Sequence, residues 1–170
     1  MRSWRRWEGH CREAGAEAAV LLSLPRMSIW HHPEIDFDAA TSFGDSSMPG
    51  HLGIKITARG DNWLEATMPV DQRTHQPFGR LHGGASVALA ETVASVAGAL
   101  TVDPAEKVVV GLEINANHIR PVRDGIVTAR AIAEAIGRTT QVWTIRITDE
   151  RDKLVCLSRI TLAVIPAKQA

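Results

Sequence analysis

A long run of small and apolar residues, from Gly84 to Leu100, is the feature that most constrains the fold of this chain. The length and the alanine content of the run predict one helix. Its larger apolar side chains point in several directions around the helix axis, with alanines between them: Val87, Leu89, Val93, Val96 and Leu100. A helix that is apolar nearly all round is buried. The rest of the chain is therefore expected to wrap around it.

The chain after this helix changes to the alternating pattern of strands. Four segments show it: Val108–Ile119, Gly125–Ile136, Gln141–Thr148 and Leu154–Ile165. In the third segment Trp143, Ile145 and Ile147 share one face, which is typical of a half-buried antiparallel sheet. The connectors between the segments are short, so we expect consecutive hairpins rather than crossovers.

The part before the helix is less regular. The stretch Phe43–Gly50 is rich in Gly, Ser and Pro, so the region before Leu52 is expected to be a helix followed by a loop. Leu64–Val70 predicts a strand, and the polar segment Asp71–Leu81 predicts a connecting loop. One long helix beside about five antiparallel strands is an α+β fold. The economical arrangement is a curved sheet wrapped around a central helix.

Composition narrows the classes of function. The 170 residues, 45% of them hydrophobic, suit one globular domain, and 19 basic residues balance 19 acidic ones. This balance argues against an electrostatic grip on nucleic acid or on an anionic membrane. The cysteines, Cys11 and Cys156, are far apart and indicate neither a disulfide framework nor a zinc site. We therefore expect a protein of the reducing cytoplasm.

The N-terminus needs a separate interpretation. Residues 1–26 combine a basic start with an apolar patch that is too short for a signal peptide, and they are too acidic for an organellar presequence. No uninterrupted apolar stretch reaches the roughly 18 residues of a membrane span. We expect residues 1–26 to be an upstream extension and residues 27–166 to form the domain. The alternative is a short amphipathic helix packed on the surface.

Glu91 is the only ionisable side chain between Gly83 and Val102. An apolar setting disfavours the charged form of an unpaired carboxylate, so Glu91 is a candidate general base or nucleophile. Ser95 lies four residues on, on the same helix face, and can bond the carboxylate or position a water. The alternative is that Glu91 reaches the surface at a helix edge or pairs with an arginine from a strand.

His82, Gly83 and Gly84 stand where a loop becomes the helix. The first-turn N–H groups and the helix dipole can hold a carbonyl oxygen that becomes an oxyanion, and the side chains of His82 and Gln76 can add donors. The alternative is a tight helix entrance with His82 as its cap. About 10 Å of helix separates Gly84 from Glu91, which is long for one helix to serve a single carbonyl. The carboxylate then comes from a facing subunit or acts through water.

Other polar residues are weaker candidates. Asn115 and Asn117 fall on one face of a strand and His118 on the other; asparagines on an inner face indicate a pocket wall, whereas edge-strand asparagines are common without one. Three arginines could bind an anion such as phosphate or lie solvated on the surface: Arg120, Arg138 and Arg159. The histidines lack the spacing of a metal site, and the chain has no GxSxG elbow, phosphate loop or GxGxxG. We therefore expect no metal and no cofactor.

Four stretches, LEATMPVD, QPFGRLHGGASVALAE, VGLEINANH and QVWTI, together resemble a known family. They are similar to hotdog-fold acyl-CoA thioesterases whose carboxylate lies within the central helix. The resemblance extends in particular to the group with the 1,4-dihydroxy-2-naphthoyl-CoA thioesterases of menaquinone biosynthesis and the proofreading thioesterases of enterobactin synthesis. It covers residues 28–165. It implies a hotdog fold with five to six strands, and a homodimer doubled to a homotetramer with active sites at the subunit interface.

The resemblance also implies roles for single residues. Glu91 becomes the nucleophile or general base toward the thioester carbonyl, Ser95 orients the hydrolytic water, and the Gly83 N–H polarises the carbonyl oxygen together with Gln76 and His82. The substrate-binding residues that it implies are His118 in the acyl pocket and, near the nucleotide end of CoA, Arg138, Thr139 and Arg159.

We therefore predict a cytoplasmic enzyme that hydrolyses acyl-CoA thioesters, with a preference for aromatic acyl groups. Two alternatives stay open: a proofreading thioesterase acting on carrier-protein thioesters, and a non-catalytic hotdog protein that binds acyl-CoA. A hotdog dehydratase needs a His and a carboxylate in motif contexts that this chain lacks. The acyl group itself is not fixed by the sequence, because one apolar change in a pocket shifts discrimination by only about 1–3 kcal/mol.

Overall fold

The computed structural model describes residues 28–169, so the predicted extension at residues 1–26 lies outside the described part. The larger elements are the helix α4 (Gly83–Leu100) and the strands β1 (Lys55–Arg59), β2 (Trp63–Pro69), β5 (Lys107–His118), β6 (Ile126–Ile136), β7 (Thr140–Thr148) and β8 (Leu154–Pro166). The shorter ones are α2 (Phe37–Ser42), α3 (Met48–Leu52), β3 (His75–Gln76), β4 (Arg80–Leu81) and the 3-10 turn η1 (Ala167–Gln169).

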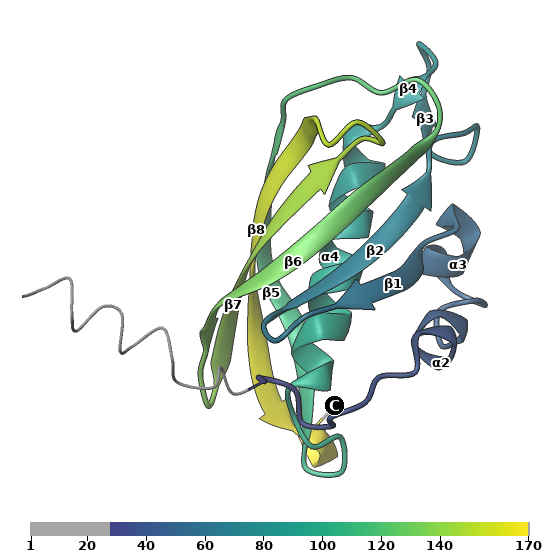
Figure 1. The fold of residues 1–170 in the computed structure, drawn as a ribbon. Coiled ribbons are helices and arrows are strands. Elements are labelled where there is room, and N and C mark those ends of the chain that lie inside the picture. Colours follow the sequence, from purple (N-terminus) through teal and green to yellow (C-terminus); the bar gives the residue numbers. More distant parts are fainter. Residues whose placement is uncertain (1–27, 170) are drawn as a thin grey trace, which may run out of the picture.

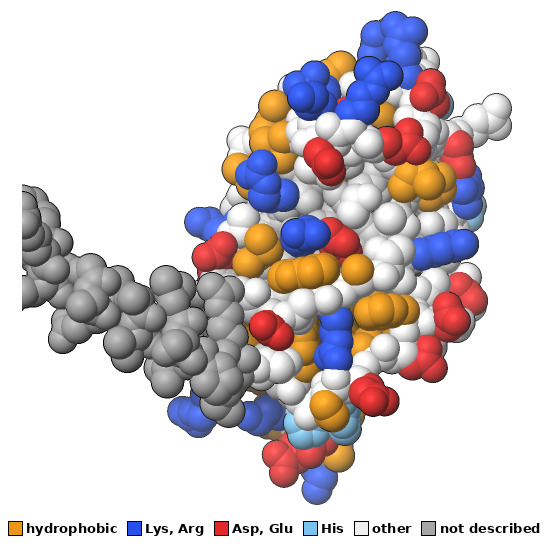
Figure 2. All heavy atoms as spheres, viewed as in Figure 1, with side chains coloured by type: hydrophobic (Ala, Val, Ile, Leu, Met, Phe, Trp, Pro, Cys, Tyr) orange, Lys and Arg blue, Asp and Glu red, His pale blue; other side chains and the backbone are white. Residues whose placement is uncertain are grey.

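The six larger strands form one sheet in the order β1-β2-β6-β7-β8-β5, and every neighbouring pair is antiparallel. The sheet curves around α4, while α2 and α3 lie beside β1 (Figure 1). The predicted α+β architecture, a curved sheet of five to six strands around one central helix, is therefore confirmed. Over the sheet face in view, basic and acidic side chains are interspersed (Figure 2).

The helix α4 begins at Gly83, one residue before the predicted start, and ends at Leu100 as expected. Its buried residues face the sheet, and most are small: Ala85, Ser86, Ala88, Leu89, Ala90, Val93, Ala94, Ala97 and Gly98. Small side chains let the helix lie close to the strands. A Cβ at Gly98 would stand 2.6 Å from Leu162 Cδ1. In length and composition α4 could also cross a membrane, but its burial against the sheet identifies it as the core helix of this domain.

The alternating pattern of the strands is confirmed in the core. Trp143, Ile145 and Ile147 are fully buried. Leu64 and Met68 on β2 are likewise fully buried, so both strands present one face to α4.

The prediction of consecutive hairpins is correct for β6–β7 and β7–β8 and wrong for β5. β5 pairs with β8 and forms the edge of the sheet, so the short connector to β6 passes the ends of β7 and β8. This connector bonds to other elements: Ile119 and Arg120 donate to Val155, and Leu81 donates to Val122. Connector length does not distinguish a hairpin from such an arch, because both need only a few residues.

Four elements before α4 were missed: α3, β1, β3 and β4. α3 begins at Met48, inside the stretch expected to be a loop, and has Pro49 in its first turn, where a missing N–H costs nothing. β1 adds a sixth strand beside β2. The segment expected to be only a connecting loop contains the β3–β4 pair, in which His75 lies opposite Leu81.

Candidate active site

Glu91 projects from α4 into solvent on the side of the edge strand β5. Its Oε1 lies so close to β5 that a Cβ at Gly111 would stand 3.3 Å away. No arginine or lysine among residues 28–169 forms an ion pair with it. The expectation that Glu91 lies unpaired in an apolar interior is therefore wrong for a single chain. The side of α4 that carries Glu91 points toward the edge of the sheet and is not covered by the strands.

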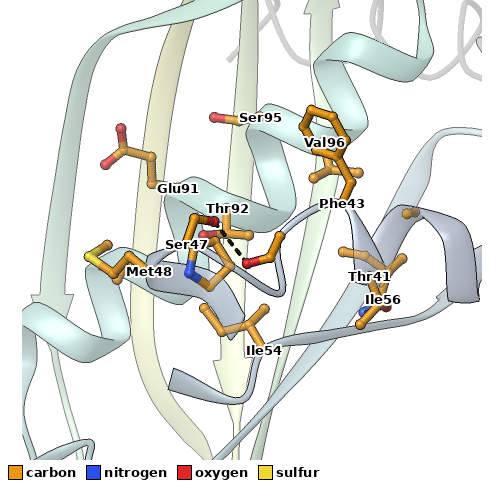
Figure 3. Close-up of a pocket in the computed structure, with 14 residues that line it drawn as sticks. Thr41, Phe43, Ser47, Met48, Ile54, Ile56, Glu91, Thr92, Ser95 and Val96 are labelled. Carbon is orange, nitrogen blue, oxygen red and sulfur yellow. Dashed lines mark hydrogen bonds between the residues drawn. The ribbon is translucent and has the colours of Figure 1, made fainter. Parts of the chain in front are cut away.

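Glu91 lines a cavity of about 400 Å³ between α4 and the α2–α3 segment. Thr92 and Ser95 line it from the same helix, which confirms that Ser95 shares the face of Glu91 (Figure 3). The α2–α3 side contributes Phe43 and Met48, which sequence analysis missed. No periodic pattern marks them, because their segment is rich in Gly, Ser and Pro and its helices are short.

The first turn of α4 has the free donors expected of it. His82 is the N-cap, and its Nδ1 accepts a hydrogen bond from the Gly84 N–H at 2.8 Å. The structure therefore shows His82 as a helix cap, the alternative raised for it from the sequence. Within the described part of the chain, the Gly83 N–H has no hydrogen-bond partner. A donor at a helix N-terminus is suited to polarise a carbonyl oxygen.

A second cavity, of about 300 Å³, lies beside Gly83. Gln76, His118 and Arg120 line it together with Gly83. His118 stands directly against the helix entrance, because a Cβ at Gly83 would lie only 2.7 Å from its Nε2. The Gln76 Oε1 accepts a hydrogen bond from the Phe78 N–H, which leaves its amide nitrogen free to donate.

The predicted catalytic residues thus fall into two groups on one chain. Glu91 and Ser95 line the cavity beside α2 and α3, whereas Gln76 and Gly83 line the cavity at the start of α4. His82 opens into a third groove, beside Arg73 and His75 of the loop before α4. One chain therefore does not bring the carboxylate and the free N–H to a common cavity.

Three predicted substrate-binding residues lie apart from these cavities. Arg138 and Thr139 are exposed in the turn between β6 and β7, at the end of the sheet opposite β3 and β4 (Figure 1). Arg159 is exposed on β8, where it lies opposite Asn115 of β5. The structure groups none of the three with Glu91 or Gly83.

The strand β5 also decides which of its polar residues face the helix. His118 lies opposite the buried Cys156, so its side chain is on the inner face. Asn115 and Asn117 are exposed on the outer face, and the Asn115 amide donates to Glu113 at 3.1 Å. The pocket wall is therefore formed by His118, and the asparagines match the alternative of ordinary edge-strand residues.

Among the described residues, no three His, Cys, Asp or Glu side chains cluster closely enough to hold a metal ion. The groups available for chemistry are one carboxylate, hydroxyls and free backbone and amide donors. Such a set can attack or hydrate a polarised carbonyl.

Comparison with known proteins identifies the family. Residues 78–156 match the family model of the thioesterase superfamily. The chain is 50% identical over 137 residues to the 1,4-dihydroxy-2-naphthoyl-CoA hydrolase of Escherichia coli. The aligned residues cover 81% of this chain and 99% of that protein. The chain belongs to the thioesterase superfamily. It is accordingly a thioester hydrolase with the hotdog fold, as the resemblance implied.

Two further relatives extend the match. The chain is 50% identical over 138 residues to the proofreading thioesterase EntH of Cronobacter sakazakii, covering 81% of this chain and 98% of that protein. A crystal structure of a Haemophilus influenzae thioesterase superposes with a TM-score of 0.79 at 54% identity, covering 82% of this chain and 96% of that one. One of these relatives is named for a substrate, 1,4-dihydroxy-2-naphthoyl-CoA, whereas the other two are named only as thioesterases.

Proposed function

We propose that this thioesterase hydrolyses acyl-CoA thioesters with aromatic acyl groups, such as 1,4-dihydroxy-2-naphthoyl-CoA, at a site shared by two copies of the chain. One observation supports this most directly: Glu91 and the free Gly83 N–H belong to one helix but open into different cavities. A second copy can supply the missing half of each site. The choice of an aromatic acyl-CoA follows the Escherichia coli relative.

In this proposal the Gly83 N–H polarises the thioester carbonyl with the Gln76 amide as a further donor, and His82 supports them by capping the first turn of α4. Glu91 of the partner subunit attacks the carbonyl carbon or removes a proton from the water that attacks it, and the partner subunit's Ser95 orients that water. If Glu91 acts as the base, the tetrahedral intermediate collapses with cleavage of the C–S bond to the carboxylic acid and the CoA thiolate, which takes up the proton that Glu91 removed from water. If Glu91 attacks, cleavage of the C–S bond leaves a mixed anhydride between the acyl group and Glu91. The water held by Ser95 then hydrolyses this anhydride to the carboxylic acid and the free Glu91 carboxylate, and the CoA thiolate takes up the proton released.

The edge strand β5 is the proposed site of pairing. It is 12 residues long, and along its outer edge it presents a row of backbone groups that no other strand of residues 28–169 covers. Val110 and Leu112 on it are 40% and 61% exposed. An uncovered apolar edge of this length is a template for pairing with another strand. Antiparallel β5–β5 pairing brings the two α4 helices side by side, and we further propose that two such dimers form a tetramer in the cytoplasm.

Subunit complementation tests the shared site. Glu91→Gln and Gln76→Ala chains, each inactive alone, are co-refolded. Random C2 pairing makes half of the dimers mixed, and each mixed dimer has one intact site, so about a quarter of wild-type activity should return. Benzoyl-CoA hydrolysis is followed by release of the thiol.

The matched control pairs Glu91→Gln with Ser95→Ala. Both changes fall in the same half-site, so every site in the mixture has at least one defect and no activity should return. If neither mixture recovers activity, the site lies within one chain and the shared arrangement is wrong. Undiminished turnover by a folded Glu91→Gln enzyme would remove Glu91 from the chemistry altogether.

A second substrate is favoured by one specific observation: the EntH relative is as similar to this chain as the naphthoyl-CoA hydrolase is. The alternative function is therefore proofreading of acyl groups held on a carrier protein. Measuring kcat/KM for the same aromatic acyl group on CoA and on a carrier protein separates the two. A higher value on the carrier protein would overturn the preference for CoA.

A further inference from the structure

The cavity beside Glu91 has walls of two different kinds. The α4 wall holds its polar groups, namely the Glu91 carboxylate and the hydroxyl-bearing side chains of Thr92 and Ser95. The opposite wall comes from the α2–α3 segment and the start of β1, and it is mainly apolar: Ala40, Phe43, Met48, Pro49, Ile54 and Ile56. A ligand in this cavity meets polar groups on one side only.

The few polar side chains of the apolar wall are occupied within it. The Thr41 Oγ1 accepts a hydrogen bond from the Ile56 N–H at 3.0 Å, and the Ser47 hydroxyl donates to the Gly44 carbonyl at 2.8 Å. Among residues 28–169, Glu91 is the only charged residue that lines the cavity. A negatively charged group inside it would therefore face a like charge, and the described residues offer it no cation there.

The two ends of the cavity also differ. Glu91 and Met48 lie toward one end, and Phe43 and Val96 toward the other (Figure 3). Phe43 is 94% exposed, although it stands at the rim of an apolar cavity. The helix before it, α2, has no fully buried residue and packs on the core only through the half-buried Phe37 and Ala40, so this rim is held less tightly than the sheet.

We propose that this cavity holds the acyl group, with the thioester carbon at the Glu91 end, and that Phe43 closes over the far end. This inference rests on the proposed thioesterase site and adds the residue that selects the substrate. The preferred class is a neutral apolar acyl group, and acyl groups that end in a carboxylate are rejected. A cavity of roughly 150 Å³ holds benzene, so the 400 Å³ here has room for two fused rings.

Two substitutions of Phe43 test the inference. Phe43→Ala removes the cover, and we expect kcat/KM for 1-hydroxy-2-naphthoyl-CoA to fall about tenfold while that for acetyl-CoA stays within twofold, because only a large acyl group reaches the far end. Phe43→Arg places a cation there. The ratio of kcat/KM for glutaryl-CoA to that for benzoyl-CoA should then rise at least about tenfold.

Matched controls are Ile126→Ala and Ile126→Arg. Ile126 is 47% exposed on β6 and lines none of the cavities described above, so it reports the effect of losing an exposed apolar side chain or of adding a surface cation away from the cavities. Both controls should leave the substrate ratios unchanged. The oligomeric state of each variant is measured by light scattering.

The outcomes separate this inference from the proposed function. A wild-type enzyme that hydrolyses none of these thioesters overturns both. If wild type is active but the Phe43 variants change all substrates by one common factor, or by none, only the inference is wrong. It is also wrong if wild type hydrolyses glutaryl-CoA as well as benzoyl-CoA, or if Phe43→Ala alters the oligomeric state, which would make Phe43 an interface residue.

Discussion

Replacing Gly83 by alanine should separate activity from stability. The added Cβ would stand 2.7 Å from His118 Nε2, closer than real contacts allow, and 3.1 Å from its Cδ2 and Cε1, which is also tight. His118 is exposed at the end of β5, so its ring can turn away without moving the backbone. Gly83 is not among the glycines with positive φ, so alanine fits the backbone.

The expected magnitudes follow from these contacts. Alanine is a better helix former than glycine by up to about 1 kcal/mol, so the melting temperature should stay the same or rise by roughly 2–4 °C. Loss of a whole oxyanion donor costs about 10²–10³ in kcat. Because Gly83→Ala keeps its N–H and displaces only His118, we expect kcat/KM to fall by a smaller factor, about 10- to 100-fold.

The assay is kcat/KM for benzoyl-CoA, with melting followed by calorimetry. His118→Ala supplies the control: if Gly83→Ala acts by displacing this ring, it should cause little further loss in the His118→Ala background. The reasoning is refuted if kcat/KM of Gly83→Ala stays within twofold of wild type, or if the two losses multiply. A melting temperature lowered by several degrees would show instead that the helix entrance itself requires glycine.

Three further predictions concern other parts of the molecule. Gln141→Leu should lower the free energy of unfolding by about 1–3 kcal/mol in urea titrations, because the buried Trp143 Nε1–H loses the acceptor that it contacts at 3.0 Å; adding Trp143→Phe should recover part of this. Gly111→Ala places a Cβ 3.3 Å from Glu91 Oε1 and should lower kcat about two- to tenfold without changing the melting temperature, since misplacing a catalytic group by about 1 Å costs up to 10². Burial raises the pKa of the Cys156 thiol, so the folded chain keeps a proton that the unfolded chain loses; stability should fall as pH rises above roughly 8.5 and should not do so in Cys156→Ala.

The local parts of the fold could be predicted from the sequence because local patterns decide them. The burial of Trp143 and Ile145 follows from a period of two along one strand, and the extent of α4 follows from its composition. The pairing of β5 with β8 could not be predicted in this way. The partner of β5 depends on the position of the chain at the end of α4, and that position is set by how the helix packs on the whole sheet.

The sequence predicted which residues could form the candidate site, but it predicted the environment of those residues only in part. Glu91 is surrounded along the sequence by apolar residues, which indicated burial, but a helix residue meets its neighbours three and four positions away. The positions four residues before and after it hold Val87 and Ser95, and Ala99 lies one turn further on; none of these three is buried. This stripe is therefore the side of α4 that the sheet does not cover. Val87 is the one large apolar residue in it, so helical periodicity alone left the exposure of Glu91 open.

The exposure of Glu91 has a physical logic for an enzyme of this kind. Burying a lone carboxylate inside the folding core would cost several kcal/mol of desolvation unless donors were paired with it, and α4 has no cation to offer. A carboxylate at the edge of the sheet leaves the stability of the chain untouched. Its surroundings become dry only when the proposed second copy and the acyl group cover it, and the donors at Gly83 of that copy arrive at the same step. Folding of the single chain therefore does not require a buried charge on α4. The Glu91 carboxylate loses its water only later, when the subunits assemble and the substrate binds.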